Sequence, residues 1–330
     1  MSLVSVIVPA YNRLAFLKQT VKSVLGQIFC EWELIVIDDG SSDGTSDWVR
    51  AQSCLDSRIH LIERSEFRPA CSGAQVCRNL GFQKAAGTSV LFLDSDDLLA
   101  PDCLLNRLAH LNADPSFDAV VGQALHFSEQ PGDLGTDRIW GRWHPSQDDL
   151  DCFLSDAIPW QTSGPLWRRE SLERVGPWDE SLQHVGHDHE FHVRALCRGL
   201  KIARVERVDY YWRVPREDSL SSLESFKTRH RDGGMIRAYQ AILHQVVKSG
   251  SLTPLRRRLM VAESIRLAVR CRNFGGSASM AEQILLDACN AHLIDRGTTT
   301  VCRVLLRCWW RLGGILPSMA LLNRLASRIS

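Results

Sequence analysis

The sequence predicts an α/β fold in which a largely parallel sheet flanked by helices occupies residues 1–222 and a helical region occupies residues 223–330. Two observations lead to this prediction. In the first hundred residues, short runs rich in Val, Ile and Leu alternate with helical patterns, which is typical of parallel strands covered by helices. Residues 226–330 lack strand alternation and carry apolar residues at helical spacing. A chain of 330 residues with 45% hydrophobic content can bury the core that this fold needs.

The strands are predicted from short apolar runs bounded by turn residues. They span residues 3–8, 33–38, 58–63, 88–93, 118–122 and 201–206. Helices are predicted where apolar residues recur every three or four positions, at residues 16–25, 169–175 and 188–197. Gly81 lies in a further helical stretch, which it is expected to break or kink. The Gly, Pro and Asp residues of 129–149 indicate an exposed excursion.

Composition excludes several classes of protein. The formal net charge of +1 provides no global basic field, which argues against nucleic-acid binding. The 11 cysteines form no CxxC pair and are interpreted as reduced thiols. The N-terminus lacks the features of a signal peptide, and arginines interrupt every apolar stretch that approaches the roughly 18 residues of a membrane span. We therefore expect a cytoplasmic protein that does not cross a membrane.

Polar residues follow three of the predicted strands. They are Pro9-Ala10-Tyr11-Asn12 after the first strand, Asp38-Asp39-Gly40-Ser41-Ser42-Asp43-Gly44-Thr45 after the second, and Asp94-Ser95-Asp96-Asp97 after the fourth. In open parallel sheets, ligands bind outside the carboxyl ends of the strands. These three segments are therefore expected to form one binding site. The second segment can also be interpreted as a turn followed by a capped helix.

The acidic segment after the fourth strand is the most specific chemical feature. Clustered carboxylates repel one another unless a cation or hydrogen bonds compensate. Mg²⁺ and Mn²⁺ prefer oxygen ligands and bridge carboxylates to phosphates, so Asp94 and Asp96 are candidates to hold a metal-bound diphosphate. The alternative is that Asp96 or Asp97 caps a helix beginning at Pro101. Arg78 is expected either near a phosphate or ribose, or in a surface ion pair.

Four stretches in register resemble family 2 glycosyltransferases of the GT-A fold. They are VSVIVPAYN at residues 4–12, ELIVIDDGSSDGT at 33–45, CRNLG at 77–81 and VLFLDSDD at 90–97. The resemblance covers roughly residues 3–222, and four motifs in order are more specific than any one of them. It implies an inverting enzyme that moves a hexose or N-acetylhexosamine from a nucleotide sugar, with UDP expected, to a hydroxyl of a glycan or lipid-linked glycan.

The residues expected to bind the donor are Pro9, Tyr11, Asp39, Arg78, Asp94, Ser95 and Asp96. The resemblance implies that Pro9, Tyr11 and Asp39 surround the nucleotide base. Asp39 would read the nucleotide base and Asp94 would face the ribose. Asp96, at the position of the DXD motif, would coordinate Mn²⁺ or Mg²⁺. The metal would offset the charge that develops on the leaving nucleotide. Pro215 stands where related proteins often have a histidine near the metal, which leaves a third protein ligand open.

A general base must take the proton from the acceptor hydroxyl. The segment Gly186-His187-Asp188-His189-Glu190 resembles the family's Gly-Glu-Asp-x-Glu pattern, so Asp188 takes the position of the base. His187 replaces the usual acid, which is expected either to lower the pKa of the base or to alter acceptor contacts. A zinc site built from His184, His187, Asp188, His189 and His192 is the alternative, although no HExxH spacing is present.

Candidate acceptor contacts are Trp160, Gln161, His187 and Glu190. Trp160 is expected either to stack on a sugar ring or to belong to the core. A catalytically inactive protein that binds nucleotide sugars or carbohydrates is the alternative function, because a fold alone does not establish activity.

The C-terminal region combines arginines with apolar residues at 255–272 and 300–328, separated by a loop at 275–279. One interpretation is a packing or homodimerisation module. The other is a peripheral helix at the inner face of the membrane, with Trp309 and Trp310 on its apolar side.

Overall fold

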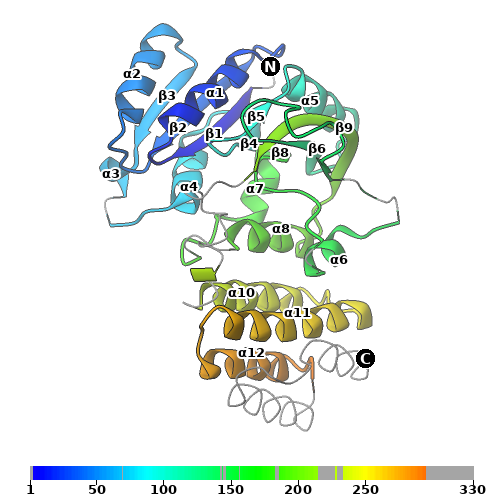
Figure 1. Cartoon of the computed structure of the whole chain (residues 1–330). Coiled ribbons are helices and arrows are strands. Elements are labelled where there is room, and N and C mark those ends of the chain that lie inside the picture. Colours follow the sequence, from blue (N-terminus) through cyan, green and yellow to red (C-terminus); the bar gives the residue numbers. More distant parts are fainter. Residues whose placement is uncertain are drawn as a thin grey trace. The chain divides into compact units, whose positions relative to one another are not determined.

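The computed structural model describes residues 3–68, 70–141, 143, 146–155, 157–182, 186–214, 227–228 and 233–294. The chain divides into two compact units. The first unit takes residues 1–145, 159–181 and 198–214, and the second takes 146–158, 182–197 and 215–330. Figure 1 shows the elements of both. His184, Pro215, Trp309 and Trp310 lie outside the described residues.

Within the described part of the first unit, nine strands form one sheet in the order β3-β2-β1-β4-β8-β6-β9-β5, with β7 paired to β6. The strands are β1 (Val4–Ala10), β2 (Trp32–Asp38), β3 (Ile59–Glu63), β4 (Ser89–Phe92), β5 (Leu98–Leu99), β6 (Ala119–Phe127), β7 (Ile139–Trp140), β8 (Pro165–Arg168) and β9 (Ile202–Arg213). Strands β3, β2, β1 and β4 are parallel, as predicted. Strand β8 runs antiparallel between β4 and β6, so the far half of the sheet is mixed. The α/β class is confirmed.

Helices cover both faces of this sheet (Figure 1). They are α1 (Leu14–Leu25), α2 (Thr45–Leu55), α3 (Arg64–Phe67), α4 (Ala74–Lys84), α5 (Cys103–Ala113) and α7 (Arg169–Val175). Leu17 of α1 and Leu108 of α5 share one core cluster with Val6 of β1. Ile7, whose side chain points to the other face, lies against α4.

Gly81 does not break its helix, because α4 continues to Lys84. A Cβ atom at Gly81 would lie 2.4 Å from Ile7 Cγ2 and 3.3 Å from Ile37 Cδ1. The glycine therefore lets the helix approach the sheet closely, at the cost of a weaker intrinsic helix preference.

Strand β9 is about twice as long as predicted, because its second half contains charged and aromatic residues that break the apolar pattern. Asp209 lies inside this half and is 1% exposed. Arg107 of α5 donates to its two carboxylate oxygens at 2.7 Å and 2.6 Å. The ion pair compensates the buried charge, which allows an aspartate in the strand interior.

The described part of the second unit is helical, which confirms the predicted helical C-terminal region. Its helices are α6 (Asp149–Leu154), α8 (His187–Cys197), α10 (Gly234–Lys248), α11 (Pro254–Asn273) and α12 (Ala278–Asn290). Arg256, within the basic segment 255–272, pairs with Asp148 and Asp151 at the start of α6. Among the described helices, none is both long and apolar enough to cross a membrane.

Candidate functional site

The loops that follow β1 and β2 are joined at the carboxyl edge of the sheet. The amide of Asn12 donates to Ser41 Oγ at 2.9 Å, and the amide of Ser42 donates to Asn12 Oδ1 at 2.8 Å. Asn12 adopts a left-handed conformation with φ of 49°, which asparagine tolerates better than most residues. Tyr11, one of the predicted base contacts, is 59% exposed beside this junction.

Asp39 is held by two groups that sequence reasoning did not identify. Arg64 Nε donates to Asp39 Oδ1, and the amide of Gly73 donates to Oδ2 at 2.8 Å. Each carboxylate oxygen still has a lone pair to accept from a nucleotide base. Pro9 lies in β1, paired with Ile37 of the neighbouring strand, so these predicted residues belong to adjacent strand ends.

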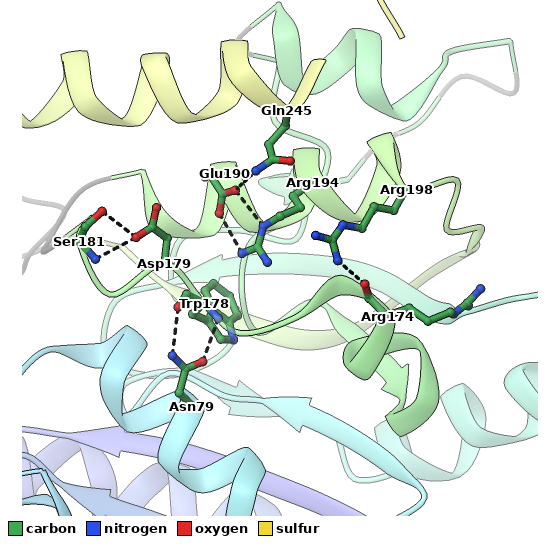
Figure 2. Close-up of polar contacts among 9 residues, drawn as sticks. All are labelled: Asn79, Arg174, Trp178, Asp179, Ser181, Glu190, Arg194, Arg198 and Gln245. Atoms are coloured by element: carbon green, nitrogen blue, oxygen red, sulfur yellow. Dashed lines mark hydrogen bonds and ion pairs between the residues drawn. The ribbon is translucent and has the colours of Figure 1, made fainter. Parts of the chain in front are cut away.

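Arg78 and Asp94 form a partly buried ion pair, with 2.7 Å between Nη2 and Oδ1. The Arg78 side chain is 3% exposed and that of Asp94 is 36% exposed, so the pair has its arginine inside the protein rather than on the surface. Its guanidinium lies 4.7 Å from the ring of Trp178, whose main chain is fixed by Asn79 (Figure 2). Within the described part of the chain, Arg78 Nε and Nη1 are buried without a hydrogen-bond partner. Unused buried donors of this kind are suited to a ligand with acceptor oxygens.

Residues 94–97 form a tight segment after β4, here called the acid turn. The amide of Asp94 donates to Ser163 Oγ at 3.1 Å, and Ser163 Oγ donates to Asp97 Oδ2 at 2.7 Å. The helix-cap alternative is wrong, because α5 begins at Cys103 with Asp102 at its N-cap. The Asp97 carboxylate instead supports the turn from within the protein. Thr20 Oγ1 donates to the main-chain oxygen of Ser95 at 3.0 Å.

Two carboxyl groups of the acid turn, those of Asp96 and Asp97, have raised pKa values. Burial, followed by the charge of Asp94, raises the pKa of Asp96 to about 6, although Arg13 and Arg213 act in the opposite direction. Burial and the charge of Asp96 also raise the pKa of Asp97. A bound cation would relieve this repulsion and stabilise the ionised form of both carboxyl groups.

The side chains of the acid turn can supply only part of the coordination of a divalent metal. Among the described residues, no group of three or more His, Cys, Asp or Glu side chains is placed to hold a metal ion. Mg²⁺, however, is often bound by one or two carboxylates together with phosphates and waters. The acid turn, with Asp96 partly exposed, fits this second mode.

The predicted acceptor residues of the first unit are buried. Trp160 is 1% exposed and Gln161 is 7% exposed. Gln161 Oε1 accepts from the Tyr210 hydroxyl at 2.9 Å. This burial supports the core alternative for Trp160.

Helix α8 of the second unit contains His187, Asp188 and Glu190. Glu190 is 2% exposed and receives hydrogen bonds from Arg194 at 2.8 Å and 3.0 Å (Figure 2). Gln245 Nε2 of α10 donates to the same carboxylate at 3.3 Å. These hydrogen bonds hold Glu190 inside the protein, where it anchors α8. This internal role differs from the predicted contact of Glu190 with the acceptor.

Asp188 lies in the first turn of α8 and is partly buried. The amide of His189 donates to its Oδ1 at 2.9 Å. Burial by itself would raise the pKa of Asp188, but His187, His192 and this hydrogen bond together outweigh it and lower the pKa. The carboxylate is therefore ionised at neutral pH, as a general base requires. In the described part of α8, the histidines and Asp188 do not gather into a metal-binding group.

The mixed sheet and the polar carboxyl edge place the chain in a class, the GT-A glycosyltransferases. Residues 5–176, more than half of the chain, match the family described as Glycosyl transferase family 2. The chain belongs to this family.

Two curated relatives illustrate the relationship. The chain is 44% identical over 106 residues to the putative teichuronic acid biosynthesis glycosyltransferase TuaG of Bacillus subtilis, covering 32% of this chain and 40% of TuaG. It is 31% identical over 182 residues to a Nostoc glycosyltransferase, alr2836, covering 53% of this chain and 54% of that protein. The chain thus spans about two fifths of TuaG and about half of the Nostoc protein.

Solved structures share the fold. S. aureus TarS 1–349 in complex with UDP has a TM-score of 0.64 at 17% identity, over 95% of this chain and 88% of that chain. The mannosyltransferase PcManGT from Pyrobaculum calidifontis, in complex with GDP-Man and Mn²⁺, has a TM-score of 0.53 at 20% identity, over 99% and 86%. At these identities the likeness establishes a common fold.

Proposed function

We propose that this glycosyltransferase moves a sugar from a UDP-sugar to a hydroxyl group of a glycan or lipid-linked glycan, with inversion at the anomeric carbon. The transferred group is a hexose or an N-acetylhexosamine. The observation that carries the proposal is the acid turn at the carboxyl edge of the sheet, with the ion pair of Arg78 and Asp94 beside it. A partly buried acidic cluster next to a guanidinium with unused donors suits a diphosphate accompanied by a divalent cation.

Ligands of the structural relatives support the choice of donor. TarS has been solved with UDP and with UDP-GlcNAc, and glucosyl-3-phosphoglycerate synthase from Mycobacterium tuberculosis with Mn²⁺ and UDP. PcManGT has been solved with GDP-Man and Mn²⁺. We therefore assign UDP and Mn²⁺ or Mg²⁺ to this chain, with GDP as the competing nucleotide to be tested.

In the proposed donor site, Asp39 accepts a hydrogen bond from the nucleotide base beside Pro9 and Tyr11. Asp94 and Arg78 lie on the ribose and phosphate side, with Ser95 in the loop between the two acids. Asp96 is the protein ligand of the metal. A bound divalent ion supplies charge stabilisation to the departing diphosphate.

Asp188 is the proposed general base. It takes the proton of the acceptor hydroxyl as that oxygen forms a bond to the anomeric carbon, while the bond from this carbon to the diphosphate breaks. The oxygen attacks on the side opposite the leaving group, so the configuration inverts in one step. His187 adjoins the base, and the lowered pKa of Asp188 keeps it ready to accept a proton at neutral pH.

We also propose residues 1–222 as the catalytic domain and residues 223–330 as a region for packing, dimerisation or peripheral membrane contact at the cytoplasmic face. Vesicle co-sedimentation with anionic and neutral lipids, together with light scattering, separates these three roles.

The proposed function is tested in two stages. Thermal shift against a panel of UDP-, GDP-, CDP- and dTDP-sugars with Mn²⁺ identifies the donor, because a ligand of the folded state raises the melting temperature. NMR of the transfer or hydrolysis product then reports its anomeric configuration. Retention of the donor's configuration would overturn the inverting assignment. Donor binding without any turnover would favour the alternative, a catalytically inactive binding protein.

A further inference from the structure

Arg213, the last residue of β9, holds the acid turn through both its side chain and its main chain. Its Nε donates to the main-chain oxygen of Asp96 at 2.9 Å. Its amide donates to Asp97 Oδ1 at 3.0 Å. Arg213 is 4% exposed, so these contacts lie inside the protein. One residue therefore fixes two consecutive members of the turn.

The same guanidinium is fixed by elements on its other sides. Nη2 donates to Gln19 Oε1 of α1 at 2.9 Å, and Nη1 donates to the main-chain oxygen of Ser128, directly after β6. The rings of Phe16 and Phe127 lie 4.7 Å and 4.3 Å from its central carbon. A planar guanidinium with its donors in a fixed arrangement, packed between rings, is a rigid support.

We infer that Arg213 is a positioning residue for the Asp96 carboxylate, which the proposed function assigns to the divalent metal. The hydrogen bond from Nε uses the main-chain oxygen of Asp96 and not a carboxylate oxygen. It therefore fixes the peptide from which the carboxylate extends. A ligand held in place before binding loses less conformational freedom when the cation arrives. The inference rests on the proposed function, because it concerns the metal-dependent part of donor binding.

Arg168 provides a matched control with a purely structural arrangement. Its Nε donates to the main-chain oxygen of Phe117 at 2.8 Å, and its Nη2 donates to that of Leu111. Phe117 lies just before β6 and Leu111 lies in α5, and Arg168 itself is at the edge of the sheet opposite the acid turn. Both arginines thus donate to main-chain oxygens, but of the two only Arg213 donates to one in the acid turn, that of Asp96.

The experiment compares wild type, Arg213→Lys and Arg168→Lys by calorimetric titration with UDP, in excess Mn²⁺ and in EDTA. Lysine keeps the positive charge and removes the planar fork, so the comparison isolates geometry from charge. The measured quantity is the ratio of the Kd in EDTA to the Kd in Mn²⁺. For Arg213→Lys we expect this ratio to fall about tenfold, the scale of losing one charge-assisted hydrogen bond, with the Kd in EDTA within about twofold of wild type.

Arg168→Lys is expected to melt at a lower temperature and to keep the wild-type ratio. If Arg213→Lys folds and its ratio of the Kd in EDTA to the Kd in Mn²⁺ equals that of wild type, the inference is overturned and the proposed function remains. If Mn²⁺ does not change the UDP affinity of the wild-type protein, the metal assignment itself is overturned. If Arg213→Lys does not fold, Gln19→Ala removes one support of the guanidinium, and its ratio should fall two- to threefold. An unchanged ratio in Gln19→Ala overturns the inference.

Discussion

Arg78 Nη2 lies 2.7 Å from Asp94 Oδ1, and this ion pair joins helix α4 to the acid turn. The two residues are 16 positions apart and come from motifs that the sequence places in separate segments. The pair brings a guanidinium with two unused donors to the residue that is proposed to face the ribose.

Replacing Arg78 tests whether these donors bind the nucleotide. Arg78→Met should weaken UDP binding by at least about tenfold, because hydrogen bonds from a charged donor to phosphate or ribose oxygens are lost. The loss should be present in EDTA as well as in Mn²⁺, since the guanidinium acts directly on the nucleotide. Calorimetry measures both. Equal UDP affinity in Arg78→Met and wild type would assign the arginine a structural role.

Asp96→Ala should abolish the gain in UDP affinity that Mn²⁺ provides, and leave the Kd in EDTA within about threefold of wild type. The expected gain reflects a metal that bridges the carboxylate to the diphosphate. Asp47→Asn is the control, since the Asp47 side chain is 87% exposed on α2. If Mn²⁺ still increases the UDP affinity of Asp96→Ala, the metal must be bound by other residues.

Asp188→Asn should retain UDP affinity and reduce turnover by on the order of a hundredfold or more, the usual scale for losing a general base. The amide keeps the shape of the side chain but cannot accept the acceptor's proton. Steady-state kinetics with saturating donor measure the loss. If UDP binding falls together with turnover, Asp188 has a structural role and the base must be sought elsewhere.

The pH dependence of turnover should report the environment of Asp188. Its pKa is lowered from 3.8, so the base is ionised throughout the neutral range. With Mn²⁺ saturating, so that Asp96 stays ionised as a metal ligand, the acid limb due to Asp188 should follow that lowered pKa. His187→Asn removes a nearby positive charge, so the pKa of Asp188 should rise and the acid limb of the kcat profile should move to higher pH. His110→Asn, on the exposed side of α5, is the control. If the acid limbs of His187→Asn and wild type are identical, His187 does not lower the pKa of Asp188.

The buried ion pair of Arg107 and Asp209 predicts a large stability effect. Asp209→Ala leaves a guanidinium that is fully buried without its counter-charge, which should lower the free energy of unfolding by about 3–5 kcal/mol. Asp47→Ala, which breaks an exposed pair with Arg50, should change it by less than about 1 kcal/mol. Chemical denaturation compares the two. Similar effects of both substitutions would contradict the assignment of a buried pair.

The parallel half of the sheet could be predicted from sequence because its strands are continuous apolar runs. Strand β9 could not be bounded in the same way, since Asp209 is tolerated only through Arg107, which is 102 residues away. The acid turn itself was recognisable from its clustered aspartates. Its supports were not, because Ser163 and Arg213 belong to distant segments that carry no local signal of their role.

The candidate site also combines residues whose position follows from local sequence pattern with residues whose position depends on distant contacts. Asp39, Arg78, Asp94 and Asp96 lie at strand ends or in a motif helix, where position in the sheet follows from local pattern. Glu190 matched the family pattern as well as Asp188 did, but burial beside Arg194 directs it inward. Which of two neighbouring acids remains partly exposed depends on tertiary packing that a sequence pattern does not encode.

The interleaving of the two compact units has a consequence for synthesis on the ribosome. Along the sequence, the chain changes from one unit to the other five times. Within the second unit, helices α6 and α8 are therefore synthesised well before α10, α11 and α12. Helix α8 receives the hydrogen bond of Gln245 only after α10 has been translated. The segment that bears Asp188 therefore lacks its packing partner until α10 has been synthesised. A nascent chain that ended near residue 222 would contain α8 without the helix that anchors it. Translation as far as α10, rather than completion of the sheet alone, supplies the helix whose Gln245 anchors α8.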